Sequence, residues 1–194
     1  EGLWEEYKSP RISEGGYGYR QRASIFAQDE FKPFDDYFYI VPGVRYESDS
    51  QFGSQTTPKL SMRWDPSSDV KLRFGVGRGY RAPSFKDLYF AFQNPGVGYQ
   101  VVGNENLKPE HSVGYNGGIE YEPKKWLWIG LDGYYNSITN LIDFRRTPDR
   151  KNDLTTYQMV NVSKAYTRGA EFLIEIRPFE KLRFAVGYTL IDTL

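Results

Sequence analysis

The sequence predicts an all-β fold, an antiparallel up-and-down transmembrane β-barrel segment of about eight strands. Three observations predict it. Apolar and polar residues alternate in successive runs, the connections between the runs are short and long in turn, and some runs are longer than ordinary soluble strands.

The alternation has the two-residue period of a β-strand, in which successive side chains point to opposite faces. In residues 59–64, Leu60, Met62 and Trp64 alternate with polar residues. The pattern recurs in residues 71–77, 112–121, 127–136, 169–177 and 182–190. Two earlier runs, residues 18–31 and 37–48, complete the set, and the first has the weakest alternation.

The connections between the runs also alternate in length. Short segments rich in Pro, Asp or Lys lie at residues 32–36, 65–69, 122–125 and 177–181. Longer polar segments lie at residues 48–56, 81–110 and 144–156. Short turns on one side and long loops on the other are typical of an outer-membrane barrel. The Greek-key links of a soluble sandwich would alternate less regularly.

Two runs are unusually long. Residues 125–143 and 157–177 are near-continuous strand candidates. Each has about 20 residues, whereas ~9–11 residues cross a bilayer and soluble strands usually have about 5–6. These lengths predict a barrel wall that projects beyond the membrane.

Aromatic residues concentrate beside the short connections. They are Phe31, Phe34, Tyr37, Trp64, Tyr121, Trp126 and Phe179. An aromatic girdle at the membrane–water interface would place them there, although the same residue types also favour strands in soluble proteins.

Charged residues share the face opposite the apolar one. They are Lys59, Arg63, Lys71, Arg73, Glu120, Glu171, Glu175, Arg177 and Arg183. Charges of both signs on an inner barrel face can pair across strands, and a lipid-facing Lys or Arg at midplane would cost ~2–4 kcal/mol. The alternative interpretation is that these charged residues form the solvent-exposed face of a sheet in a soluble protein.

The composition excludes several classes of protein. The 25 basic and 25 acidic residues balance, which removes the simplest argument for a nucleic-acid partner, and none is expected. There is no Cys for a disulfide, a thiolate metal site or a cysteine nucleophile. No apolar stretch approaches the ~18 residues of a membrane helix. The mean hydropathy of −0.63 is compatible with a barrel, whose lumen and loops are polar.

Several segments resemble TonB-dependent receptors. Residues 77–89 contain the aromatic-Arg-Ala-Pro tetrad Tyr80 to Pro83, which in that family precedes a short helical turn. Residues 103–110 resemble the family's Asn-Pro-Asn-Leu-x-Pro-Glu signature, with Glu105 where Pro is commoner. Further similarity lies in residues 25–31, 42–46 and 161–171. The segments follow the family's order and cover essentially residues 18–194.

This resemblance implies that residues 1–194 are an internal part of a barrel of about 22 strands with a plugged lumen. The plug domain and the final strands are expected to lie outside this sequence. The implied function is non-enzymatic, energy-coupled uptake of a scarce nutrient across the bacterial outer membrane. The implied partners are the TonB complex, through the plug, outer-membrane lipid, and a small-molecule or metal-chelate ligand.

The segment 81–110 is the best candidate for ligand contact. Its aromatic, amide and guanidinium groups suit a large polar ligand such as a siderophore, cobalamin or glycan. The candidate residues are Arg81, Tyr89, Phe92, Asn94, Tyr99, Asn104 and Asn106. Residues 80–83 and 104–109 are expected to serve loop geometry first, since Pro83 and Pro109 restrict the backbone.

The sequence gives little support to catalysis, and no metal site or cofactor is expected. The single histidine, His111, is interpreted as a polar residue where the loop re-enters the wall. A role as a haem ligand is the minority interpretation, because haem receptors of the family typically carry a His within the segment that corresponds to residues 84–103. The glycines at 75, 77 and 79 lack the spacing of a nucleotide loop and are expected to make room inside the barrel.

Two alternatives remain open. A soluble all-β ligand- or glycan-binding module would bury its apolar face in a closed core. A complete eight-stranded barrel would need a closing strand with a terminal aromatic, whereas this sequence ends at Thr193 and Leu194.

Overall fold

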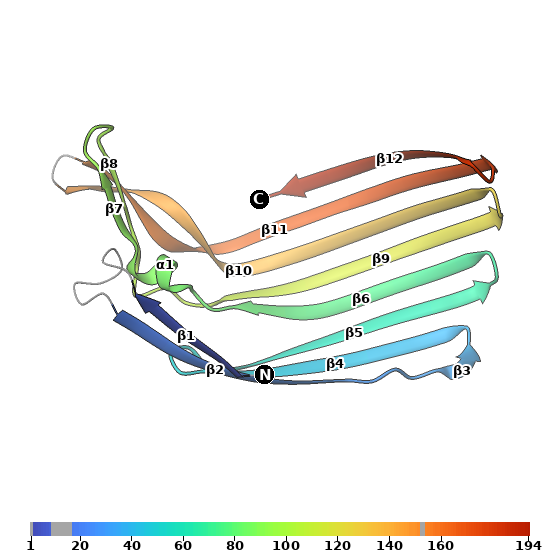
Figure 1. Cartoon of the computed structure of the whole chain (residues 1–194), viewed down its shortest axis with the longest axis horizontal. Coiled ribbons are helices and arrows are strands. Elements are labelled where there is room, and N and C mark those ends of the chain that lie inside the picture. The colour runs from blue at the N-terminus through green and yellow to red at the C-terminus, as the bar shows by residue number, and fades with distance from the viewer. Residues whose placement is uncertain (1, 9–16, 152–153) are drawn as a thin grey trace.

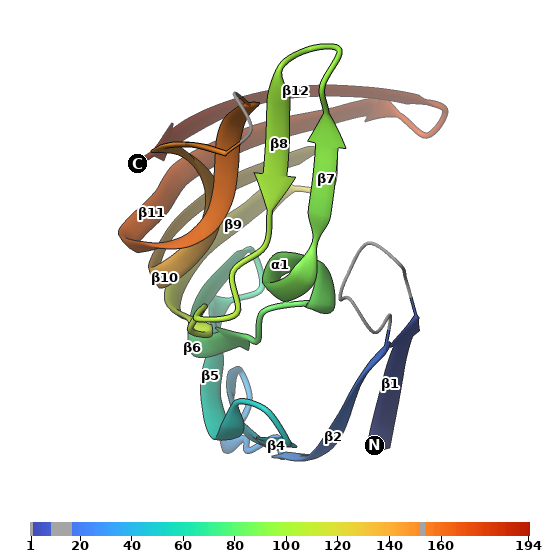
Figure 2. The ribbon, with the colours of Figure 1, turned by 90° about the vertical axis from the view of Figure 1, so that its left-hand side faces the viewer.

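One large antiparallel sheet forms most of the molecule and curves into an open trough (Figures 1 and 2). The computed structural model describes residues 2–8, 17–151 and 154–194. The wall strands are β1 (Gly2–Lys8), β2 (Tyr17–Gln28), β4 (Phe38–Asp49), β5 (Gly53–Ser67), β6 (Val70–Arg81), β9 (Glu110–Lys124), β10 (Leu127–Lys151), β11 (Leu154–Phe179) and β12 (Leu182–Thr193). Each strand from β4 on pairs antiparallel with the next wall strand.

Every run predicted from alternation is a strand, namely β2, β4, β5, β6 and β9 to β12. The described residues add β1, β3 (Pro33–Asp36), β7 (Ala91–Asn94) and β8 (Tyr99–Val102). Strands of four residues are too short to show a reliable period, so β3, β7 and β8 could not be recognised from the sequence.

The predicted alternation of short and long connections is only partly correct. The short turns lie together at the right-hand end of the sheet in Figure 1, as predicted. The expected long connection at residues 48–56 is wrong, because β4 ends at Asp49 and β5 begins at Gly53. Residues 144–151 and 154–156 are also strand rather than loop. Polar segments can remain strands because hydrogen bonding between two arms of a hairpin needs no apolar face.

β10 and β11 extend beyond the wall as a long two-stranded arm. β9 pairs with β10 only as far as Thr139, opposite His111. Asn140 follows with φ 57°, a left-handed conformation that Asn adopts more readily than most residues. The arm therefore leaves the sheet at a residue suited to the change of backbone direction.

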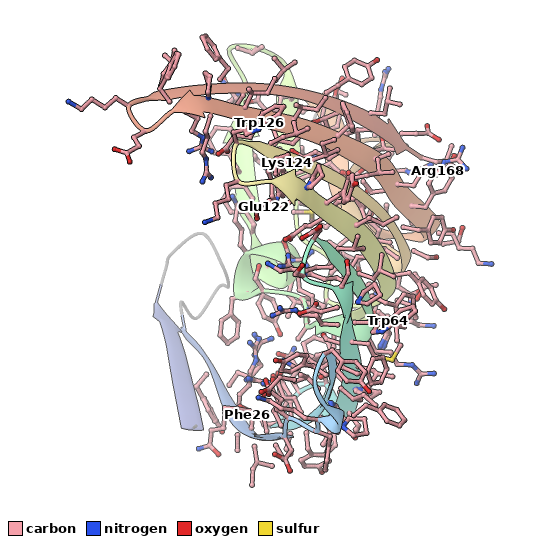
Figure 3. The ribbon with its side chains drawn as sticks, turned by 90° about the vertical axis from the view of Figure 1, so that its right-hand side faces the viewer. Phe26, Trp64, Glu122, Lys124, Trp126 and Arg168 are labelled. Carbon is pink, nitrogen blue, oxygen red and sulfur yellow. The ribbon has the colours of Figure 1, made fainter. Side chains whose placement is uncertain are left out.

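The register places the predicted apolar residues of all strands on one face. Leu60 lies opposite Val76, and Phe74 lies on the same face. Ile129 lies opposite Ile174, which lies opposite Val186 on β12. Because side chains alternate along each strand, aligned pairs make one continuous apolar face. Trp64 and Arg168, on this face, point to the convex side of the sheet (Figure 3).

This apolar face is uncovered, which contradicts the closed core expected of a soluble module. Phe74 is 42% exposed, Leu131 48% and Phe184 55%. The aromatic residues predicted to form a girdle beside the short turns are all exposed as well. The buried apolar cluster among the described residues consists only of Leu88, Leu107 and Met159. A sheet that presents this much apolar surface requires an apolar environment outside it.

The polar face lies on the concave side, where the helix α1 (Phe85–Tyr89) is also found (Figure 2). The predicted inner charges lie here and pair across strands. Arg73 contacts Glu120 at 2.5 Å. Glu175 pairs with both Arg177 and Arg183. The ion pairs follow from a register that brings opposite charges together on neighbouring strands.

Glycines on the polar face make room for neighbouring side chains. A β-carbon at Gly75 would lie 2.4 Å from the Asn116 side chain, and one at Gly79 would lie 2.3 Å from Ser112 Oγ. The predicted role of these glycines in creating space inside the trough is consistent with this packing.

No helix of the described residues has the length and hydrophobicity needed to cross a membrane.

Candidate ligand-binding surface

A capped helix begins the connection between β6 and β9. Ser84 is the N-cap of α1, and its side chain accepts a hydrogen bond from the Asp87 backbone N–H at 3.1 Å. The Asp87 carboxylate accepts from the Ser84 backbone N–H at 2.9 Å. This reciprocal pair satisfies N–H groups that a helix start leaves without partners. The short helical turn expected after the Tyr-Arg-Ala-Pro tetrad is therefore confirmed.

Arg81 connects the two ends of the loop. Its guanidinium donates to both carboxylate oxygens of Glu110, at 2.8 and 2.7 Å, and to Asp87 at 3.3 Å. Glu110 also accepts from the backbone N–H of Ile142 at 2.8 Å. Bidentate pairing of a guanidinium with a carboxylate fixes orientation as well as distance. The last residue of β6, the first of β9 and the base of the β10 arm are thus held together.

Glu110 is held in its charged form by these contacts. Partial burial tends to raise the pKa of Glu110, but the hydrogen bonds from Arg81 and Ile142, with the charge of Arg81, outweigh it. The pKa of Glu110 is therefore lowered from the ordinary 4.5.

Close backbone packing anchors α1 to the end of the loop. Leu88, 2% exposed, contacts Leu107 and Met159 in the buried cluster. Gly103 N–H donates to the Phe90 carbonyl at 2.6 Å. A β-carbon at Gly103 would lie only 2.5 Å from the Leu88 carbonyl oxygen. Only a residue without a side chain fits at position 103.

Asn104 links this loop to β11. Its side-chain amide donates to the Met159 carbonyl at 3.0 Å, and its side-chain oxygen accepts from the Asn106 backbone N–H at 3.0 Å. Asn161 makes a second link, accepting from Lys108 N–H at 2.8 Å. The expectation that residues 104–109 serve loop geometry agrees with these contacts.

On the other side of the trough, Arg20 of β2 holds α1. The Arg20 guanidinium donates to the Pro83 carbonyl at 2.7 Å and lies 5.4 Å from the centre of the Phe85 ring. It also pairs with Asp49 at 3.5 Å. Arg20 is only 2% exposed, so its buried charge is balanced by a carboxylate and a carbonyl.

Above α1, the β7–β8 hairpin projects from the end of the trough (Figure 2). Its turn includes Gly98 with φ 77°, where Gly is favoured, and Gly98 N–H donates to the Asn94 carbonyl at 3.0 Å. β8 pairs in parallel with β11, Tyr99 lying opposite Thr155. The buried Gln100 side chain donates to Thr156 Oγ1 at 2.8 Å. The hairpin is thus attached firmly to the arm.

An aromatic cluster joins the hairpin to the arm. The Phe92 and Tyr99 ring centres lie 6.1 Å apart, and Tyr99 meets Tyr157 edge-on at 6.5 Å. Beside it is an open hollow of about 460 Å³ lined by Val97, Gly98, Tyr99, Arg146, Thr155 and Tyr157. Aromatic faces next to a guanidinium can bind an aromatic or anionic group of a ligand.

The predicted contact residues divide into two groups. Phe92, Asn94 and Tyr99 belong to the hairpin near the hollow. The others lie at the loop base, and they are Arg81, Tyr89, Asn104 and Asn106. Arg81 and Asn104 are engaged by the loop contacts described above, and Tyr89 accepts a hydrogen bond from Gln51 at 3.3 Å. The hairpin group is therefore better placed to meet a ligand.

Arg146, Thr155 and Tyr157 were missed as site residues. Arg146 and Thr155 come from the segment 144–156, which was expected to be a loop, and Tyr157 begins the strand expected at 157–177. The three residues reach the hollow only because β8 pairs with β11. Pairing between segments so far apart in the chain has no local sequence signal.

A larger hollow, of about 1080 Å³, lies at the opposite end, around the β11–β12 turn, with Trp126 and Phe179 in its lining. It borders β12, which pairs only with β11 among the described strands.

Within the described part of the chain, no group of three or more His, Asp or Glu side chains could hold a metal ion.

Comparison with known families identifies this architecture. The profile of the "TonB dependent receptor-like, beta-barrel" family matches residues 6–194. The chain belongs to this family.

Relatives of known name support the assignment of this TonB-dependent receptor segment. The ferrienterobactin receptor of Escherichia coli K12 is 29% identical over 177 residues, covering 86% of this chain and 24% of the relative. The vitamin B12 transporter BtuB of Vibrio vulnificus is 35% identical over 105 residues, covering 54% of this chain and 15% of the relative. The segment thus spans about a quarter or less of the length of these relatives.

Solved structures agree with the fold. The siderophore receptor PirA from Pseudomonas aeruginosa aligns with a TM-score of 0.88 at 21% identity, covering 99% of this chain and 38% of that one. A mutant of the ferric enterobactin receptor PfeA from the same species, in complex with enterobactin, aligns with a TM-score of 0.74 at 27% identity. That alignment covers 90% of this chain and 28% of the PfeA chain. The trough is therefore an arc of a TonB-dependent barrel, and its uncovered apolar face meets membrane lipid.

Proposed function

We propose that this segment forms part of the wall and of the extracellular ligand surface of an outer-membrane receptor for a ferric siderophore. The receptor is a non-catalytic transporter. Uptake is driven by the TonB complex, which acts through a plug domain in the lumen. The polar concave face, with charges of both signs, is suited to contact such a plug.

The observation that carries the choice of ligand is the hollow beside Tyr99, Tyr157 and Arg146. Siderophore chelates are large, and many combine aromatic rings with negative charge. Aromatic side chains and one guanidinium provide stacking and charge for such a molecule. The names of the relatives favour this class, since the ferrienterobactin receptor covers 86% of this chain and the vitamin B12 transporter 54%.

Uptake by the full-length receptor that carries this segment tests the proposal. Cells lacking other receptors for the probes would be supplied with radiolabelled ferric enterobactin or with cyanocobalamin. We expect energy-dependent uptake of the ferric chelate only. Uptake of cyanocobalamin alone would replace the siderophore assignment, and uptake of neither probe would contradict it.

A matched pair of variants tests the hollow itself. Arg146→Gln should weaken binding of the ferric chelate by roughly 10- to 100-fold, because a charge-assisted hydrogen bond contributes roughly 1.5–3 kcal/mol. Arg145→Gln is the control, since Arg145 is the adjacent exposed residue and does not line the hollow. Equal effects of the two substitutions would argue against a ligand site here.

A further inference from the structure

The β7–β8 hairpin and the arm form one small sheet at the loop end of the molecule (Figure 2). Its strands lie in the order β10, β11, β8 and β7. β8 pairs with β11 over only four residues, from Tyr99 opposite Thr155 to Val102 opposite Gln158. Because side chains alternate between the faces of a sheet, Tyr99, Thr155 and Tyr157 share the face that borders the hollow. The opposite face is called the back face below.

A chain of side-chain hydrogen bonds crosses the back face. Gln93 of β7 donates to Gln100 Oε1 of β8 at 3.2 Å, and Gln100 Nε2 donates to Thr156 Oγ1 of β11 at 2.8 Å. Thr156 Oγ1 donates in turn to the Leu154 carbonyl at 3.5 Å. Thr147 Oγ1 of β10 donates to the Thr156 carbonyl at 3.3 Å. Side-chain hydrogen bonds therefore connect all four strands of the small sheet.

Gln100 is the central and most buried member of this chain. It is 3% exposed and its acceptor Thr156 is 7% exposed. A buried amide or hydroxyl that loses its partner is not compensated by water. In the observed register, both polar ends of the Gln100 amide have a partner. Moving β8 by one residue along β11 would turn the Tyr99 ring to the back face and bring Gln100 to the hollow.

The backbone of β8 does not select this register by itself. Backbone hydrogen bonds are nearly independent of side-chain identity, and a pairing of four residues contributes few of them. The Thr155 N–H, which donates to the Gly98 carbonyl at 2.9 Å, would meet another carbonyl after a shift. The hydrogen bond between Gln100 and Thr156 is specific to one register, so its loss would free the hairpin to slide.

We propose that Gln100 is a positioning residue for ligand binding, which acts through Thr156 to hold Tyr99 at the hollow. Gln100 does not touch the ligand, because its amide is buried on the back face. Its effect is to keep the Tyr99 ring beside that of Tyr157, with 6.5 Å between their centres. The inference rests on the proposed function, in which the hollow binds a ferric siderophore, but the register can be measured without a ligand.

The first test measures binding of ferric enterobactin to the full-length receptor in detergent. Gln100→Leu keeps the size of the side chain and removes its hydrogen bonds. Loss of one buried hydrogen bond shifts a two-state equilibrium about 10-fold, and the apparent Kd rises in proportion as the binding-competent form is depleted. We expect binding about 10-fold weaker, with the heat-modifiable migration of a folded barrel unchanged.

Gln158→Leu is the matched control for this substitution. Gln158 lies on the same back face, opposite Val102, and its side chain makes no hydrogen bond with the described residues. The control should bind ferric enterobactin as the unmodified receptor does. Equal losses in the two leucine variants would overturn the proposal.

A double substitution separates positioning from a general loosening of the hairpin. Tyr99→Ala should weaken binding in the unmodified receptor. It should add little in the Gln100→Leu variant, because Tyr99 has already left the hollow in most molecules of that variant. Fully additive losses would show that Gln100 acts independently of Tyr99 and would overturn the proposal.

A disulfide can replace the hydrogen bond. Positions 100 and 156 lie opposite each other on neighbouring strands, about 4.8 Å apart and within the range of a disulfide. This part of the receptor contains no cysteine of its own. The Gln100→Cys, Thr156→Cys variant should bind as the unmodified receptor does when oxidised, and about 10-fold more weakly when reduced. Weak binding in both states would overturn the proposal.

A second cysteine pair measures the register without ligand. Val101→Cys with Tyr157→Cys places two thiols opposite each other on the hollow face. Oxidation should join them about 10-fold more slowly when Gln100→Leu is also present. Equal rates with and without Gln100→Leu would overturn the proposal. Slower cross-linking in a receptor that does not bind ferric enterobactin would contradict the siderophore assignment while supporting the role of Gln100 in setting the register.

Discussion

Glu110 accepts two hydrogen bonds from the Arg81 guanidinium, at 2.8 and 2.7 Å, across the two ends of the 81–110 connection. The same carboxylate accepts from the backbone of Ile142 at the base of the β10 arm. The loop that projects the hairpin is therefore closed at its base by one charged group.

The first prediction concerns pH. The pKa of Glu110 is lower in the folded protein than the ordinary 4.5. Its contribution to loop stability is therefore present above about pH 4.5 and is lost as pH falls through the folded pKa. Hydrogen exchange of residues 103–110, corrected for the intrinsic pH effect, should be slow at pH 7 and faster at pH 3.5.

The control for this prediction is Glu110→Gln, which carries no charge at any pH. Its residues 103–110 should exchange faster than in the unmodified protein at pH 7, with little further change on acidification. A full pH response in this variant would show that another group is responsible.

The second prediction concerns Gly103. Gly103→Ala would force its β-carbon against the Leu88 backbone, which cannot move without displacing α1. We expect a loss of about 1–3 kcal/mol in local stability, typical of overpacking, and faster proteolysis of the loop. Gly96→Ala is the control, because its β-carbon would meet only an Asn94 side-chain atom at 3.7 Å. Equal cleavage rates in the two variants would contradict the packing argument.

The third prediction separates anchoring residues from ligand-contact residues. Asn104→Ala removes the hydrogen bond to Met159 and should loosen the loop by about 1 kcal/mol. Asn94→Ala, at the tip of the hairpin, should leave proteolysis unchanged while altering ligand affinity. Limited proteolysis and ligand titration on both variants check this. If Asn104→Ala changed the affinity for the ligand without changing the rate of proteolysis, Asn104 would be a ligand-contact residue and not an anchoring residue.

The fourth prediction tests the assignment of the two faces. Leu131→Arg places a charge on the lipid-facing side and should cost up to ~2–4 kcal/mol, depending on its depth in the membrane. Asp132→Arg, on the next residue, places the same charge in the lumen, opposite Glu171. We expect poor assembly only for Leu131→Arg, measured as heat-modifiable protein in the outer-membrane fraction. Poor assembly of the Asp132→Arg variant alone would show that the lipid-facing and lumen-facing sides are assigned the wrong way round.

The ligand surface was only partly predictable. Tyr99 and Phe92 could be recognised as candidates because the long connection combines aromatic rings with amides and a guanidinium, groups that suit a large polar ligand. Arg146 could not, since its segment had the composition of a loop, and Tyr157 could not, since it begins a predicted wall strand and gives no local sign of its contact with the hairpin. Arg81 and Asn104 were recognisable as distinctive residues, but their hydrogen-bond partners lie too far away in the chain to be identified from local pattern.

The sequence by itself determined eight strands of the wall (β2, β4, β5, β6 and β9 to β12), their alternating faces and their short turns, because strand periodicity and turn chemistry are local properties of the chain. The alternation alone assigns Leu60, Phe74, Ile129 and Phe184 to the apolar faces of their strands. Only the tertiary structure decided that polar residues 144–151 continue as an arm and that β8 joins it in parallel. These depend on hydrogen bonds between distant backbone segments, which are nearly independent of side-chain identity.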